Sequence, residues 1–128
     1  MIDKDKIKSA VSSIIEALGD DPNREGLQDT PRRVAEMYTE FFSGLDEDPA
    51  DVLATGFEEG HQELVVLRDI PFFSICEHHF LPFYGSVHIG YIPKGRVVGA
   101  SKLARALEIL ARRPQIQERL TDQLVEAL

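Results

Sequence analysis

The chain has 128 residues, of which 43% are hydrophobic and 28% are charged, the balance of one globular domain of ordinary size. Its formal net charge of −8 argues against general binding to nucleic acids or anionic membranes, because their phosphates repel an acidic protein. A single cysteine excludes a framework of internal disulfides. There is no apolar run of membrane-spanning length and no apolar signal core at the N-terminus, so a cytoplasmic protein is expected.

Residues 1–60 have the pattern of an N-terminal helical region. Apolar side chains recur from Ile7 to Leu18 at intervals of three and four, which predicts an amphipathic helix ending at Gly19. A second helix is predicted to begin at Thr30-Pro31, where a capping residue precedes a proline.

Residues 61–128 have the composition of an α+β core. Branched and aromatic residues predict strands in three segments: 63–70, 84–92 and 96–98. Further helices are predicted from Ser101 and after Pro114. This order suggests an antiparallel sheet with two helices on one face. So few strands make a thin sheet, and its edges require additional strands or an oligomer to cover them.

The densest cluster of reactive side chains is Cys76-Glu77-His78-His79, between two predicted strands. Cys76 and His79 are three residues apart, so a turn can direct a thiolate and an imidazole to one point, and this pair of ligands suits zinc. His78 is free to donate or accept a proton near neutral pH. The alternative is a buried cysteine beside exposed loop histidines, since two ligands alone do not complete a zinc site.

Positive charge is concentrated in residues 91–120, which carry seven basic and two acidic side chains in an acidic protein. Ser101 and Lys102 lie at a predicted helix start, where free N–H groups favour an anion, and Arg105 shares a helix face with Lys102. A phosphate or carboxylate pocket is therefore expected here, with an ordinary solvated helix as the alternative.

Gln117 and Glu118 lie at the start of the last predicted helix. A carboxylate accepts two hydrogen bonds side by side, which suits the N–H edge of a guanine ring. Spacing alone favours a simpler role, in which Glu118 stabilises the first helical turn through the helix dipole.

Several motifs, in this order along the chain, resemble the GTP cyclohydrolase I family: Gly26–Val34, Ser74–His79, Gly99–Arg105 and Arg113–Thr121. The resemblance covers roughly residues 10 to 128. It implies zinc-dependent hydrolysis of GTP at C8, with release of formate and ring closure to 7,8-dihydroneopterin triphosphate. This reaction is the first step of folate and pterin biosynthesis.

The resemblance also implies a role for each candidate residue. Cys76 and His79 are similar to ligands of a Zn2+ ion, and His78 is similar to an adjacent acid/base group. The implied triphosphate-binding positions are Ser101, Lys102 and Arg105, and the implied guanine-binding positions are Gln117 and Glu118. A zinc ion would lower the pKa of a bound water to about 7 and make hydroxide available.

Members of this family have the tunnelling fold, with antiparallel strands, two helices and then two further strands. Their subunits form a ring-stacked homo-oligomer, usually a decamer, with active sites at subunit interfaces. GTP and further copies of the chain are therefore the expected partners, with no nucleic acid and no membrane. The chain ends at Leu128, before the strand pair that carries the second zinc cysteine, so we expect a truncated member of the family.

Two other functions stay open at this point. One is a catalytically inactive nucleotide-binding or regulatory subunit, which would bind nucleotide without releasing formate. The other is a related tunnelling-fold enzyme in which Cys76 attacks a pterin-like or deazapurine substrate. Such a nucleophile would not need His79 three residues later, so this function is the less favoured.

Overall fold

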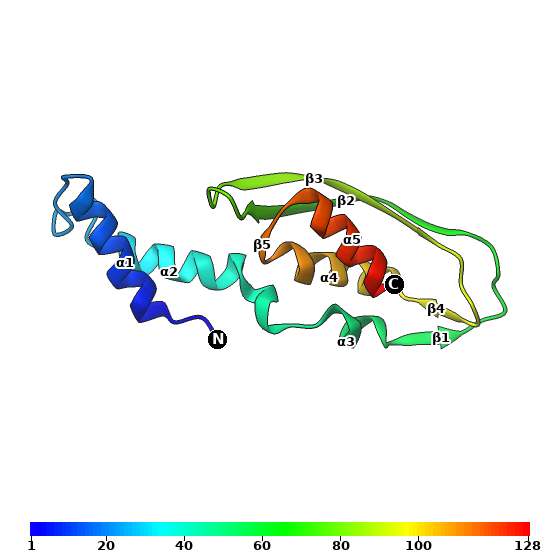
Figure 1. Cartoon of the computed structure of the whole chain (residues 1–128). Coiled ribbons are helices and arrows are strands. Elements are labelled where there is room, and N and C mark those ends of the chain that lie inside the picture. The colour runs from blue at the N-terminus through cyan, green and yellow to red at the C-terminus, as the bar shows by residue number, and fades with distance from the viewer. The chain divides into compact units, whose positions relative to one another are not determined.

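The computed structural model describes residues 1–128 (Figure 1). The chain has two compact units, Met1–Phe42 and Ser43–Leu128. Residues 43–60 therefore pack with the second unit, although their sequence pattern groups them with the N-terminal helices. No helix has both the length and the apolar character that crossing a membrane requires.

The first unit is a pair of helices, α1 (Lys4–Ala17) and α2 (Thr30–Phe41), which confirms both predicted helices. Gly19 follows α1 with a φ of 86°, a left-handed conformation that commonly ends a helix and that glycine adopts without strain. Ile15 of α1 and Ala35 of α2 are buried in this unit, whereas Ile14 and Leu18, which belong to the predicted apolar stripe of α1, are exposed.

The second unit contains both helices and strands. In order they are η1 (Ser43–Asp46), α3 (Pro49–Leu53), β1 (Gly56–Glu58), β2 (Val65–Cys76), β3 (Pro82–Tyr91), β4 (Arg96–Val98), α4 (Ala100–Ala111), β5 (Pro114–Gln115) and α5 (Gln117–Ala127). The two long helices confirm the pattern predicted for this region, and β5 is a strand that the sequence did not predict.

The main sheet has the strand order β3-β2-β5, with β2 and β3 forming a long antiparallel hairpin. β2 continues to Cys76, beyond the predicted end at residue 70, and passes through Pro71. Proline is tolerated in a strand with a free edge, and β5 pairs with β2 only at Ile75 and Cys76. The register shifts near Asp69, which has a φ of 59° at this bulge.

β4 is the predicted returning strand, but it does not extend the main sheet. It pairs with β1 in a separate two-stranded antiparallel sheet. Gly95 forms the preceding turn with a φ of 89°. The Tyr91 hydroxyl accepts a hydrogen bond from the Val98 N–H at 3.0 Å, which fixes the chain just before α4.

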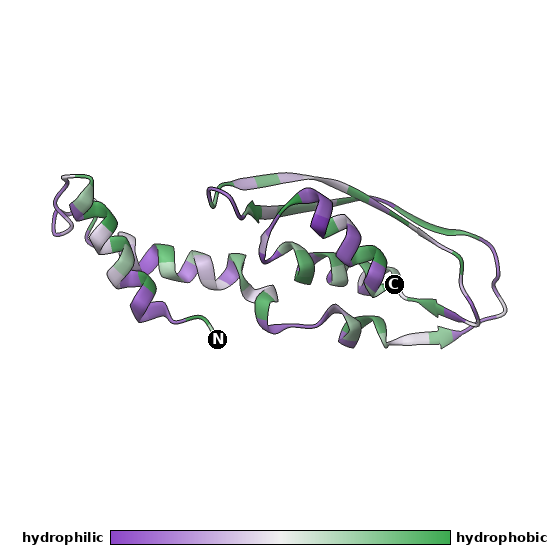
Figure 2. Cartoon of the chain, viewed as in Figure 1, coloured by the Kyte–Doolittle hydropathy of each residue, from purple (hydrophilic) through white to green (hydrophobic).

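The core lies between the β2–β3 hairpin and the helices α4 and α5, which both cover one face of it (Figure 1). In Figure 2, α4 is largely apolar, whereas α5 alternates between polar and apolar bands. The buried cluster consists of Ile89, Leu103, Ala106, Leu107, Leu110, Ala111, Leu120 and Leu124. This arrangement confirms the predicted α+β class with two helices on one face of the sheet.

Hydrogen bonds connect the η1 turn to the residues that follow α4, which explains why η1 belongs to the second unit. The Arg113 guanidinium donates hydrogen bonds to the carbonyl oxygens of Gly44 at 3.0 Å and Glu47 at 2.7 Å. The Gly44 N–H donates to the Arg112 carbonyl at 3.0 Å. Residues 43–47 are thereby positioned beside α4.

Candidate active site

The predicted metal ligands lie in the loop of residues 76–81, which joins β2 to β3. The Cys76 N–H donates to the Leu81 carbonyl at 2.8 Å, and the Phe80 N–H donates to the Cys76 carbonyl at 2.8 Å. Phe80 has a φ of 56°, so the turn closes through a left-handed residue. The loop therefore holds Cys76 and His79 within a single turn.

The side chains of this loop differ in their exposure. Cys76 is half-buried, whereas His78 and His79 are exposed. The His78 Nε2 lies 4.0 Å from a carboxylate oxygen of Glu77. The loop thus presents two imidazoles to solvent and one partly sheltered thiol.

Glu77 ties this loop to the first turn of α5. Its carboxylate accepts two hydrogen bonds from the Arg119 guanidinium, at 2.5 and 3.0 Å. These bonds lower the pKa of Glu77 and raise the pKa of Arg119, so both groups remain charged. The Glu77 N–H also donates to the Gln115 carbonyl at 2.9 Å, so backbone and side chain are both fixed.

Gln115 of β5 is fully buried and holds α4 and α5 together behind the loop. Its side-chain N–H groups donate to the Leu110 carbonyl at 3.0 Å and to the Gln123 carboxamide oxygen at 2.7 Å. A buried amide with two such partners is a specific link rather than a surface contact. Residue type and spacing gave no signal for this role.

Gln117 and Glu118 are exposed in the first turn of α5, the same turn that Arg119 connects to the loop. The N-cap position is Ile116, and no side chain caps this helix. Glu118 therefore forms no capping hydrogen bond, and its interaction with the helix terminus is limited to the dipole. The Glu77–Arg119 bonds place this helical turn beside the 76–81 loop, whereas the Gln117 side chain lines a different pocket, together with Tyr84 of β3 and Thr121 of α5.

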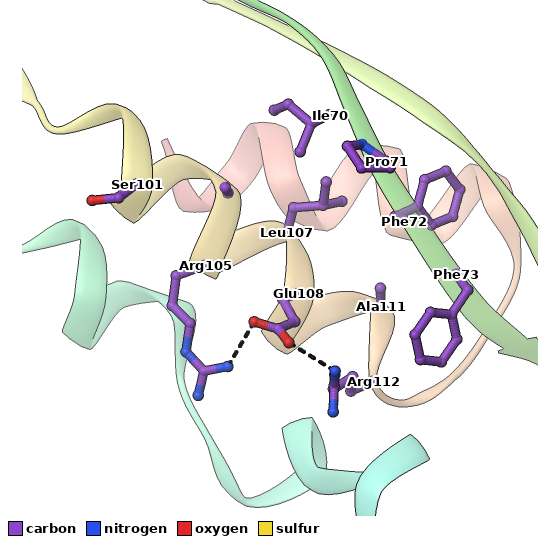
Figure 3. A pocket seen from close by; sticks show the side chains of 11 residues that line it. Ile70, Pro71, Phe72, Phe73, Ser101, Arg105, Leu107, Glu108, Ala111 and Arg112 are labelled. Carbon is purple, nitrogen blue, oxygen red and sulfur yellow. Dashed lines mark hydrogen bonds and ion pairs between the residues drawn. The ribbon is translucent and has the colours of Figure 1, made fainter.

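Ser101, Lys102 and Arg105 lie in the first half of α4, whose N-cap is Gly99. Ser101 and Arg105 line a cavity of about 510 Å³ between β2 and α4, together with Phe73, Glu108 and other residues of both elements (Figure 3). Its walls therefore combine an apolar strand with charged side chains of a helix.

Arg105 pairs with two carboxylates, of which Glu108 lines this cavity and Glu47 does not. Its guanidinium donates to Glu108 at 3.0 Å and to Glu47 at 2.7 Å, and these contacts raise the pKa of Arg105. Glu108 also forms an ion pair with Arg112 at 2.8 Å (Figure 3). The helical spacing of Glu108 could have indicated its contact with Arg105, but nothing in the sequence indicated Glu47.

The elements thus place the candidate residues in two regions of the second unit, which we call clusters. The loop cluster consists of Cys76, His78, His79, Gln117 and Glu118, and the helix cluster consists of Ser101, Lys102 and Arg105. Ser101 is ten residues from the C-terminal end of α4, a rise of about 15 Å along the helix axis. The loop cluster lies beside that C-terminal end, through β5.

Nowhere does the chain gather three or more histidine, cysteine, aspartate or glutamate side chains in a group that could hold a metal ion. The loop cluster therefore supplies a thiol and imidazoles without a further protein donor. The sequence pattern did not indicate the supporting roles of Glu77, Gln115 and Arg119.

Comparison with known proteins identifies relatives over the whole chain. Residues 7–128 match the family model described as GTP cyclohydrolase I. A GTP cyclohydrolase 1 from Dehalococcoides mccartyi is 62% identical over 130 residues, which cover 100% of this chain and 69% of that protein. A GTP cyclohydrolase 1 from Halalkalibacterium halodurans is 60% identical over 128 residues, covering 99% of this chain and 68% of that protein. The corresponding protein from Carboxydothermus hydrogenoformans is 58% identical over 129 residues, covering 100% of this chain and 67% of its own length.

Proposed function

The chain belongs to the GTP cyclohydrolase I family, and we propose that it opens GTP by hydrolysis at C8, releases formate and closes the product to 7,8-dihydroneopterin triphosphate. Family membership supports the cyclohydrolase activity itself. The finer proposal is carried by one observation, the packing of the Cys-Glu-His-His loop beside the first turn of α5. We place the reaction in the cytoplasm, at the start of folate and pterin biosynthesis.

Glu118 and Gln117 are the proposed contacts for guanine. The Glu118 carboxylate is exposed and makes no capping bond, so it can accept two N–H groups from the edge of the base. Gln117, one residue earlier, offers both an amide donor and an acceptor. A base held here lies next to the loop whose imidazoles would act on it.

Cys76 and His79 are the proposed zinc ligands. A thiolate and an imidazole are donor types that zinc prefers, and a closed turn holds both residues, so they fit as part of a ligand set. Zinc bound there would lower the pKa of a water molecule and supply hydroxide near neutral pH. His78 is exposed beside them and would donate or accept a proton at its imidazole during ring opening.

Ser101, Lys102 and Arg105 are the proposed triphosphate contacts. The start of α4 presents unpaired backbone N–H groups, because no side chain caps it. Arg105 already pairs with Glu47 and Glu108, so a bound triphosphate would have to compete with these carboxylates. This competition would moderate the affinity for GTP.

We further propose that the active protein is a ring-stacked homo-oligomer, a decamer by analogy with its family, in which neighbouring subunits complete each site. The outer edge of β3 pairs with no other strand in the chain. Tyr84 on this strand is 88% exposed, and Leu81, the residue just before β3, is 65% exposed. An unpaired edge with exposed apolar side chains is suited to a second copy of the chain.

A second candidate function is a catalytically inactive nucleotide-binding or regulatory subunit. The observation that favours it is the loop cluster itself, which provides fewer metal donors than a catalytic zinc site normally has. Such a subunit would bind GTP through Gln117 and Glu118 and release no formate.

The test is formate release from GTP by the purified wild-type chain and by Cys76→Ser, His78→Ala and Glu118→Gln. We expect formate from the wild type, loss of about 10²-fold or more in kcat for His78→Ala, and a raised KM for Glu118→Gln. Cys76→Ser should lose both zinc and activity.

His61→Ala is the matched control, because His61 is an exposed histidine outside both clusters. It should retain wild-type kinetics. Binding of GTP without any formate from the wild type would select the inactive subunit instead.

A further inference from the structure

We infer that Glu77 and Arg119 are positioning residues, whose ion pair sets the 76–81 loop against the first turn of α5 and thereby aligns the two halves of the loop cluster. This inference rests on the proposed function and deepens it. Neither residue would touch GTP, and each would act through its neighbours.

The pair has the geometry of a specific link. Two guanidinium nitrogens of Arg119 donate to the two carboxylate oxygens of Glu77, at 2.5 and 3.0 Å. Such a bidentate pair fixes the relative orientation of the guanidinium and the carboxylate as well as their separation. The side chains are only 30% and 40% exposed, so the pair is partly sheltered from water.

Each partner lies next to the residues that it would position. Glu77 is between Cys76 and His78, and one of its carboxylate oxygens lies 4.0 Å from the His78 Nε2. Arg119 follows Glu118 in the first turn of α5. The ion pair therefore connects the thiol and imidazole half of the cluster to the guanine-binding half.

The ion pair lies just beyond the point where the pairing of β2 with β5 ends. The parallel pairing of β2 with β5 ends at Cys76 and Gln115. Beyond that point, two contacts join the loop to α5 and the residues just before it: the Glu77 N–H bond to the Gln115 carbonyl and the Glu77–Arg119 pair. Without the pair, the loop would keep its internal bonds but lose this side-chain link to α5.

A surface ion pair with a purely stabilising role is the competing explanation, because such pairs are common and contribute little. The two explanations differ in what changes when the pair is removed. A stabilising pair affects the melting temperature alone. A positioning pair affects zinc affinity and turnover in a protein that remains folded.

The experiment compares Glu77→Gln, Arg119→Gln, Arg119→Lys and the Glu77→Gln/Arg119→Gln double variant with the wild type. Zinc affinity is measured by competition with a chromophoric chelator, and kcat and KM are measured by formate release. We expect each Gln variant to lose about tenfold or more in zinc affinity and in kcat. The double variant should lose little beyond either single variant, and Arg119→Lys should be intermediate.

The matched control is Arg24→Gln, which removes a two-bond arginine–aspartate pair of similar geometry from the first unit. It should leave zinc affinity, kcat and KM at wild-type values. Gln variants that melt cooperatively and match the wild type in all three quantities would overturn the inference alone. A wild-type chain that neither binds zinc nor releases formate would overturn the proposed function, and with it this inference.

Discussion

Gly44 illustrates how a single residue determines the packing of the second unit. A Cβ at this position would lie 1.8 Å from the carbonyl oxygen of Ile109 and 3.0 Å from that of Arg112, both of them backbone atoms. Backbone atoms cannot move aside as a flexible side chain can. The close approach of η1 to α4 therefore requires glycine.

We predict that Gly44→Ala lowers the free energy of unfolding of the second unit by about 1–3 kcal/mol, because the added methyl forces the two backbones apart. Urea unfolding followed by circular dichroism measures this difference. Gly60→Ala is the control, since a Cβ there meets nothing within 4 Å. Equal midpoints for the two variants would contradict this account of Gly44.

Glu108 determines how available Arg105 is to an anion. It shares the Arg105 guanidinium with Glu47. Glu108→Gln keeps the shape of the side chain and removes one of the two competing charges.

We predict that Glu108→Gln binds GTP a few-fold more tightly and leaves the affinity for guanosine unchanged, because in the proposed site only the phosphates would contact Arg105. Isothermal titration with both ligands measures this. Glu16→Gln removes the same charge from the exposed face of α1 and should change neither affinity. Tighter binding of guanosine as well would show that Glu108 acts on the base instead.

The helices are the elements that the sequence predicted best. Apolar spacing of three and four located α1, α2, α4 and α5, because a helix is specified by local periodicity. The strands were located less well. Pro71 interrupts the pattern of β2, and the pairing of β5 with β2 depends on residues about forty positions away, which no local pattern records.

The connection between α1 and α2 carries a pH-dependent contact. Arg24 donates two hydrogen bonds to the Asp20 carboxylate, and these bonds lower the pKa of Asp20 below its ordinary value of 3.8. Because the folded-state pKa is lowered, this stabilisation is present above the ordinary value and is lost as the pH falls through the folded one.

We therefore predict that Asp20→Asn melts at a slightly lower temperature than the wild type at pH 7. The difference should be small, because both side chains are about half exposed, and it should shrink as the pH falls below 3.8. Thermal melts across this range test the prediction. A difference in melting temperature that grows on acidification would contradict the effect expected from a lowered Asp20 pKa.

At the scale of the whole molecule, the chain divides its candidate residues between two places. The loop cluster lies at one end of α4 and the helix cluster lies toward the other end. Such a division is compatible with sites shared between subunits, and the unpaired edge of β3 offers a place for a second copy.

Sequence spacing predicted the residues that a cluster shares in one turn better than the distant residues that support the cluster. Cys76 and His79 are close in the sequence, so their shared turn was predictable from spacing. The contacts of Glu77 with Arg119 and of Arg105 with Glu47 span 42 and 58 positions. Only the folded chain brings these charges together, so the contacts of Arg119 and Glu47 could not be found from residue type or spacing.

The central claim is that the 76–81 loop and the first turn of α5 form a zinc-dependent site for opening GTP. The most direct measurement is the zinc content per chain of protein purified without chelator, with formate release from GTP assayed on the same sample. We predict near one zinc per chain and formate formed in step with loss of GTP. A sample that binds GTP but holds little zinc and releases no formate would contradict the claim.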